Sequence, residues 1–161
     1  MTVNKTLFAS AVLTLAGCAS SIQLASNSVD AEAKLFEDTP QKGVIYIYME
    51  PTGNVLAPAG ELPISISGKV VSKIDVDTFV YAKVSPGIYT VGAHNIPSVI
   101  PVELEIKPGA ITYLSFKWGW HSGDFREVDH LMGQQDILKR KAAHLYSKPS
   151  KDNRLNVRIS H

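Results

Sequence analysis

The chain has 161 residues, of which 45% are hydrophobic, and its formal net charge is +1. This length and hydrophobic content are enough for one domain with a buried core. The near-balanced charge argues against a nucleic-acid partner, because proteins that bind nucleic acid through bulk electrostatics are strongly basic. The single cysteine excludes an internal disulfide, so packing must hold the fold together.

The N-terminal segment carries the most specific signal in the sequence. Lys5 precedes ten mostly apolar residues, 7–16, and Gly17 and Cys18 follow them. A ten-residue helix is about 15 Å long, roughly half the thickness of a bilayer's hydrocarbon core, so it cannot span a membrane. A basic start, a short apolar stretch and small residues after it are typical of a secretory signal peptide.

The end of this segment, Leu15-Ala16-Gly17-Cys18, resembles the lipobox of bacterial lipoproteins. The resemblance implies that Cys18 receives an S-diacylglycerol group and that signal peptidase II cuts between Gly17 and Cys18. The new amino group of Cys18 is then acylated, for example with palmitate, and residues 1–17 are removed. Each buried methylene contributes about 0.8 kcal/mol, so several acyl chains give a durable membrane anchor. The alternatives are a soluble exported protein with an incidental Cys18, or a catalytic Cys18.

The residues after Cys18 predict where the protein lies. Residue 19 is alanine, whereas aspartate there is the usual inner-membrane retention signal in enteric-type bacteria. We therefore expect a protein of the outer membrane that faces the periplasm, rather than one of the inner membrane. Residues 19–31 are rich in Ser, Ala and Asn, which predicts a flexible tether over 18–32 with an end-to-end distance of about 20 Å.

Short strand-like segments follow from residue 33 to the end, and we expect 33–161 to be one domain. Segment 43–49 is β-branched and aromatic throughout, which predicts a central strand covered on both faces. Pro86-Gly87 and Pro108-Gly109 predict type II turns, because the second central position needs a positive φ. The other predicted strands cover residues 64–67, 70–74, 78–84, 88–91, 100–106, 110–116 and 155–159. Their regular spacing predicts a small antiparallel β-sandwich of about seven strands.

One segment near the C-terminus has helical spacing. It contains residues at steps of three and four that share one helical face: Leu131, Gln135, Leu138, Ala142 and Leu145. Asp129 could cap this single C-terminal helix, although Gly133 weakens the first turn and moves the expected start toward Asp136. The basic run 139–141 suits the negative end of the helix dipole.

The order of the β elements resembles a bacterial family called domain of unknown function 2846, whose members are mostly small lipoproteins. The matching pieces are the aliphatic and tyrosine-containing strand 43–49, the Gly68-Lys69 turn, Pro86-Gly87-Ile88-Tyr89, and the strand after Gly109 that contains Tyr113. They lie within residues 33–117. The resemblance implies a small transthyretin-like β-sandwich on a lipid anchor, and it implies no catalytic residues.

Residues 118–130 gather side chains from which active sites are built, among them His121, Ser122, Asp124, Asp129 and His130. No nucleophile-elbow motif surrounds Ser122, and the spacing matches no standard zinc pattern. We therefore expect a polar surface loop without a metal or cofactor. The alternative is a hydrolase or metal-dependent enzyme that acts on envelope material through the loop from His121 to His130.

Trp118 and Trp120 lie two residues apart, which places both on one side of an extended segment. We expect them to cap the core beneath the helix. Alternatively, the two indoles could form, with His121, a contact for a sugar ring or for an apolar residue of a partner. The tail from Ser147 has an excess of Lys and Arg, which could meet lipid phosphates or protect an edge strand.

These features together favour a non-catalytic binding or structural module rather than an enzyme. Besides the membrane, we expect an envelope protein or a cell-surface polymer as partner. An accessory or pilotin-like subunit of an envelope assembly for secretion or efflux is a further alternative.

Overall fold

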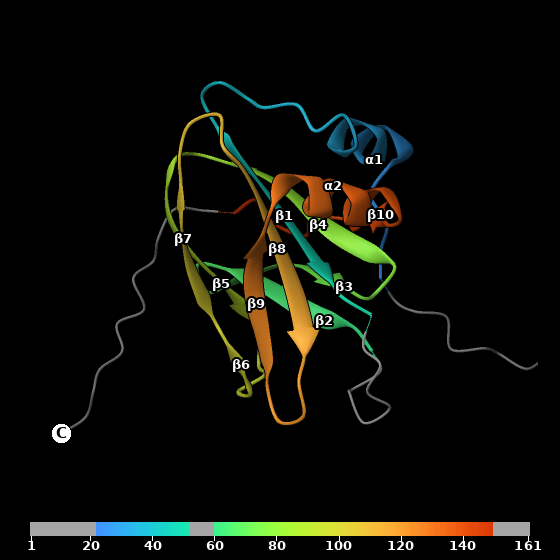
Figure 1. The fold of residues 1–161 in the computed structure, drawn as a ribbon, viewed down its shortest axis with the longest axis vertical. Helices are drawn as coiled ribbons and strands as arrows, with labels where there is room; N and C mark the ends of the chain where they lie inside the picture. The colour runs from blue at the N-terminus through green and yellow to red at the C-terminus, as the bar shows by residue number, and fades with distance from the viewer. Residues whose placement is uncertain (1–21, 52–59, 150–161) are drawn as a thin grey trace, which may run out of the picture.

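A computed structural model describes residues 22–51 and 60–149. Within these ranges the fold is mainly β, with two sheets and two short helices (Figure 1). The elements are α1 (Asn27–Ala33), β1 (Gly43–Met49), β2 (Leu62–Ile66), β3 (Lys69–Ile74), β4 (Thr78–Val84), β5 (Gly87–Ala93), β6 (Val99–Ile100), β7 (Val102–Ile106), β8 (Ile111–Trp118), β9 (Gly123–Val128), α2 (His130–Leu138) and β10 (Lys141–Ala142). Neither helix is long and apolar enough to cross a membrane.

The larger sheet has six strands in the order β10-β4-β1-β8-β9-β6. Every residue of β1 is buried, as the sequence predicts for a strand covered on both faces. Its odd-numbered residues, such as Ile45 and Ile47, enter the core that both sheets share, whereas Tyr46 and Tyr48 enter a second core. A continuous apolar run is therefore needed in β1, because neither face meets water.

The smaller sheet has four antiparallel strands in the order β3-β2-β5-β7 and packs over one face of the larger sheet (Figure 1). Its strands alternate between buried and partly exposed residues, most clearly in β2, where Leu62, Ile64 and Ile66 are buried. This alternation fits a sheet with one face on the core and the other toward solvent. The short helices cover the opposite face of the larger sheet over the second core.

The expectation of a purely antiparallel fold is wrong for the larger sheet, which is mixed. β1 pairs with β8 in parallel, and the pairs β4·β10 and β6·β9 are also parallel. The structure also has ten strands and two helices in the described residues, more than the sequence suggests. Strand spacing reveals how often the chain turns, but it carries no information on which distant strands become neighbours.

The expected flexible tether does not extend through residues 22–32, which belong to the folded domain. Leu24 forms a β-bridge with Ala143, and the N–H of Ala25 donates to the carbonyl of Ala142 at 2.8 Å. Helix α1 follows, capped by Ser26, and its Ala33 is fully buried. The low hydrophobicity of this segment predicts a tether. Backbone hydrogen bonds to the C-terminal segment hold it on the domain instead, and such bonds do not depend on side-chain hydrophobicity. Residues 18–21 lie outside the described residues.

The C-terminal helix begins at His130, directly after the cap candidate Asp129 and not nearer Asp136, and it ends sooner than the helical spacing predicts. The carboxylate of Asp129 accepts from the N–H of Met132 at 3.0 Å, so Asp129 is the N-cap. Helix α2 ends at Leu138, and the chain continues as an extended segment in which Ala142 faces one core and Ala143 the other. The predicted helical face is also wrong, because Leu131 and Leu138 are exposed while Gly133 and Ile137 are buried. The predicted strand 155–159 lies outside the described residues.

Candidate functional site

Residues 118–130 form a hairpin and a helix start rather than a polar loop. Strands β8 and β9 pair antiparallel from Tyr113↔Val128 to Trp118↔Gly123. Between them the chain turns over residues 119–122, where the N–H of Gly119 donates to the carbonyl of Ser122 at 2.8 Å. The hairpin tip lies at the end of the molecule away from the two helices (Figure 1). The sequence does not indicate a strand over 123–128, because charged residues interrupt the alternation of apolar and polar side chains.

The two tryptophans have different environments. Trp118 packs edge-on against Phe116, with ring centroids 5.0 Å apart, and so caps the core between the sheets as expected. It does not lie beneath α2, which covers the opposite face of the larger sheet. Gly123 permits this packing, because a Cβ there would lie 2.7 Å from Phe116 Cε2. Trp120 is 79% exposed in the turn, next to the exposed His121, whereas Trp118 is partly buried.

The acidic residues and histidines of this region have separate structural roles. Asp124 pairs with Arg126 at the surface at 3.2 Å, and Asp129 caps α2. His130 lies edge-on to Tyr113 and forms a hydrogen bond with Gln134 at 2.9 Å. Over the described residues as a whole, no three His, Cys, Asp or Glu side chains are placed to hold a metal ion together.

A cluster of aromatic side chains fills the second core between the larger sheet and the helices. Tyr46 and Tyr113 are neighbours on β1 and β8, and their rings stack at 4.9 Å with an interplanar angle of 10°. Phe36, Phe79 and Tyr81 surround this pair. Burial raises the pKa of Tyr113 to about 12, and it raises the pKa of Tyr46 further. These phenols therefore keep their protons at neutral pH and serve packing.

Arg140 is buried at the end of α2, although the sequence suggests only a helix-end cation. Its guanidinium lies over the ring of Tyr48 at 4.7 Å and donates to the carbonyls of Asp136 at 2.6 Å and Met49 at 3.0 Å. Tyr48 in turn donates to the carboxylate of Asp136 at 3.1 Å. A buried guanidinium is costly unless it is paired and hydrogen-bonded, and these contacts fasten the end of α2 to β1.

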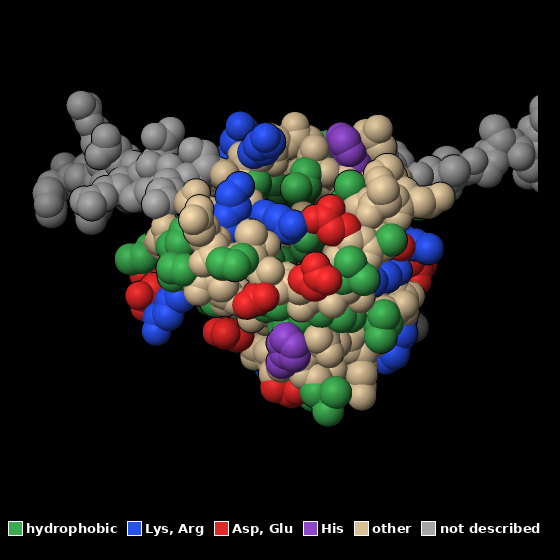
Figure 2. Space-filling view, turned by 90° about the horizontal axis from the view of Figure 1, so that it is seen from above, with side chains coloured by type: hydrophobic (Ala, Val, Ile, Leu, Met, Phe, Trp, Pro, Cys, Tyr) green, Lys and Arg blue, Asp and Glu red, His purple; other side chains and the backbone are tan. Residues whose placement is uncertain are grey.

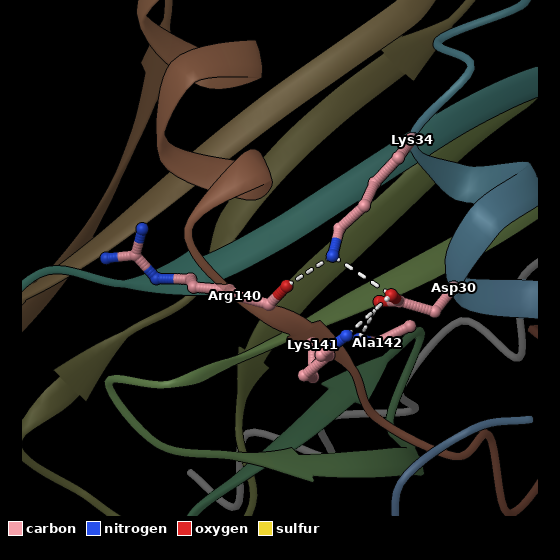
Figure 3. A network of polar contacts seen from close by, with 5 residues as sticks. All are labelled: Asp30, Lys34, Arg140, Lys141 and Ala142. Carbon is pink, nitrogen blue, oxygen red and sulfur yellow. Dashed lines mark hydrogen bonds and ion pairs between the residues drawn. The ribbon is translucent and has the colours of Figure 1, made fainter. Parts of the chain in front are cut away.

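A second polar network joins the N-terminal helix to the C-terminal segment, and we call it the terminal clasp: Asp30, Lys34, Arg140, Lys141 and Ala142 (Figure 3). One carboxylate oxygen of Asp30 accepts from the N–H of Ala142 at 2.8 Å, and the other lies 2.9 Å from Lys34 Nζ and 3.5 Å from Lys141 Nζ. Lys34 also donates to the carbonyl of Arg140 at 2.7 Å.

The groups around Asp30 favour the ionised form of its carboxylate. Burial raises the pKa of Asp30, but the hydrogen bonds from Lys34 and Ala142, with the charge of both lysines, lower it more, so the pKa lies below its ordinary value. Sequence reasoning missed this network, although two signals were present: Ser26 as an N-cap, and an Asp-Lys pair at i and i+4.

A shallow hollow of about 290 Å³ lies beside the terminal clasp. It is lined by side chains from the N-terminal segment, the β3–β4 turn and β10: Ile22, Leu24, Asp75, Asp77, Thr78 and Lys141. One of its lining residues, Ile22, is the first residue that the structure describes.

Comparison with family models, curated proteins and solved structures finds no match for this chain. The resemblance to domain of unknown function 2846 is thus supported by the quoted motifs alone.

Proposed function

We propose that the protein is a lipid-anchored envelope protein whose β domain is a non-catalytic binding or structural module. One observation carries the proposal: Leu15-Ala16-Gly17-Cys18 at the end of a short apolar stretch. In this proposal Cys18 bears the S-diacylglycerol and N-acyl groups, and the domain faces the periplasm from the outer membrane. The two sheets with a common core are compatible with the transthyretin-like sandwich of domain of unknown function 2846, and membership of that family is part of the proposal.

The hairpin tip supports a binding role. Trp120 is the most exposed large hydrophobic side chain of the described residues, at 79%, and it projects from a turn held by the hydrogen bond between Gly119 and Ser122. Tryptophan is enriched among the residues that contribute most to protein interfaces, because it combines a large apolar surface with an N–H donor. We propose that Trp120 and His121 meet an envelope protein or a cell-surface polymer, and that Trp118 supports them from the core.

The enzyme alternative has less support. Asp124, Asp129 and His130 each have a partner of their own, and none of these contacts links two of them to each other or to His121. A catalytic constellation needs its members in mutual contact or within reach of one substrate.

Replacement of the anchor cysteine tests the proposal. Cells are fed a clickable palmitate and produce either the wild-type chain or Cys18→Ser. We expect the wild-type chain to be labelled and found with outer membranes, and the variant to be unlabelled and either uncleaved or released, because serine lacks the thiol that takes the diacylglyceryl group. Ser21→Ala, three residues away, is the control and should stay labelled. Equal labelling of Cys18→Ser and the wild type would refute the anchor.

A further inference from the structure

Three exposed apolar side chains belong to segments that lie near the start of the folded domain, and we call them the anchor-side patch: Leu24, Val76 and Tyr146. We infer that this patch lies against the lipid bilayer that holds the acyl chains of Cys18. The inference rests on the proposed lipid anchor and adds to it a fixed orientation of the domain.

Chain length limits how far the domain can stand from the membrane. Because Leu24 and Ala25 are bonded to the C-terminal segment, the chain from residue 22 onward belongs to the domain. Only three residues separate Ile22 from Cys18, and four Cα–Cα steps span at most about 14 Å. Ile22 must therefore stay close to the bilayer surface, together with the side chains around it.

The patch comes from three segments that lie near residues 22–24. Leu24 lines the hollow together with Asp75 and Asp77, the residues on either side of Val76 in the β3–β4 turn. The third segment follows β10: the N–H of His144 donates to the carbonyl of Gln23, and the N–H of Tyr146 donates to the carbonyl of Val71 on β3. Leu24, Val76 and Tyr146 are 53%, 38% and 45% exposed.

The chemistry of these side chains fits the interface between lipid and water. Tyrosine favours this interface because its ring is apolar and its hydroxyl stays hydrated, and a neighbouring lysine can keep its ammonium group in the headgroup layer. Lys141 is 64% exposed at the hollow, and Asp75 and Asp77 line the same hollow. Because both signs are present, we expect contact with zwitterionic lipid to be sufficient. Seen from the end that carries the helices, charged and apolar side chains are interspersed, without an area of one sign (Figure 2).

The test depends on the fact that the chain contains only one cysteine, Cys18. Since Cys18 is lipidated in the mature protein, a second cysteine provides the only free thiol for a fluorescent label. Val76→Cys and Tyr146→Cys place the label on the patch. Ile100→Cys is the matched control, because Ile100 is 69% exposed on β6, at the opposite edge of the six-stranded sheet and five strand spacings, or about 24 Å, from β10.

Each labelled lipoprotein is reconstituted into phosphatidylcholine vesicles that contain a lipid with a nitroxide headgroup quencher. We expect the labels at 76 and 146 to lose most of their emission and the label at 100 to keep most of it. Intact mass measurement shows whether Cys18 carries its acyl chains, and circular dichroism shows that each variant is folded. If Cys18 is acylated but positions 76 and 146 are quenched no more than position 100, the proposed orientation is wrong while the anchor stands. If Cys18 carries no lipid, the proposed function itself fails.

A photo-crosslinking residue at position 76 extends the test to cells. Attachment to phospholipid supports the inference. Attachment to a protein instead would show that a protein partner covers this face, and would overturn it.

Discussion

Gly133 lies where α2 packs against Tyr113 of β8. A Cβ at this position would overlap the ring of Tyr113 and lie 2.8 Å from Tyr113 Cβ. From the sequence, Gly133 only weakens a helix turn, since glycine costs about 1 kcal/mol relative to alanine in a helix interior. The structure shows why the glycine is present: it lets the helix backbone rest on the stacked Tyr46–Tyr113 pair.

Gly133→Ala therefore sets two effects against each other. Alanine improves helix propensity by about 1 kcal/mol, whereas overpacking against the Tyr113 ring costs about 1–3 kcal/mol. Because the Cβ would overlap the Tyr113 ring, we expect the packing cost to lie in the upper part of its range and the free energy of unfolding in urea to fall by about 1–2 kcal/mol. Gln135→Ala, at an exposed position of the same helix, is the control and should leave stability unchanged or slightly raised. A Gly133→Ala protein as stable as the wild type would show that α2 can move away from Tyr113 at no cost.

At the scale of elements, the terminal clasp decides whether the N-terminal segment belongs to the domain. Helix α1 has seven residues and buries only Ala33 among them. Isolated helices of this length do not persist in water, so tertiary contacts must hold it. Besides the packing of Ala33 and Phe36, these contacts include the hydrogen bond from Tyr46 to the carbonyl of Ala33 and the bonds to the carboxylate of Asp30. The carboxylate of Glu32 also pairs with Lys83 on β4.

Because the pKa of Asp30 is lowered, the stability that its carboxylate contributes through the terminal clasp depends on pH. Because the folded-state pKa lies below the ordinary 3.8, the clasp contributes its full stability above that pH and loses it as the pH falls through the folded-state pKa. Asp30→Asn keeps the shape of the side chain but removes its negative charge. We expect it to be less stable than the wild type by about 1 kcal/mol at pH 7, with the difference closing as the pH falls below 3.8 and through the folded-state pKa.

Urea unfolding of both proteins between pH 7 and pH 2.5 measures this difference, since other carboxylates with lowered pKa values, Glu32 and Asp136, titrate alike in both. Asp124→Asn removes an ion pair whose partners are 64% and 50% exposed, and should change little at any pH. A gap between wild type and Asp30→Asn that stays constant with pH would exclude the charge as its cause.

The elements that could be predicted from the sequence are those whose signal is local. The bounds of β1 and β4 follow from their β-branched and aromatic runs, and the cap at Asp129 follows from residue type and position. The parallel pairing of β1 with β8 could not be predicted, because a strand's own pattern does not identify its neighbour. Asp30 and Ala142 are 112 residues apart, and nothing in either segment points to the other.

The same distinction between features with a local sequence signal and features without one applies to the candidate site. Trp118 could be assigned to the core from its position in a strand pattern, whereas the exposure of Trp120 depends on a four-residue turn that the sequence did not reveal. The burial of Arg140 was equally hidden, because its partners on β1 and α2 are brought together only by the fold.

At the scale of the whole molecule, the hairpin tip and the helices occupy opposite ends of the sheets (Figure 1). A photo-crosslinking residue in place of Trp120 should attach to an envelope protein or polymer in living cells, because the tip combines exposure with a fixed turn. The same residue in place of Ile88, which is 58% exposed on β5, is the matched control and should give no adduct. Equal adducts from both positions, or none from position 120, would argue against the tip as the partner contact.

The pairing of residues 22–25 with residues 142–144 also determines when the chain can finish folding. β1, at the centre of the larger sheet, needs β8, and the N-terminal segment needs residues made more than a hundred positions later. Such distant contacts fold slowly, because a long loop must close before they form. While the ribosome is still making the last third of the protein, the six-stranded sheet cannot be completed, because β8, β9 and β10 all lie in that third. A chain that is exported as proposed must cross a membrane channel unfolded, and this topology delays completion of the larger sheet until the C-terminal segment has been synthesised.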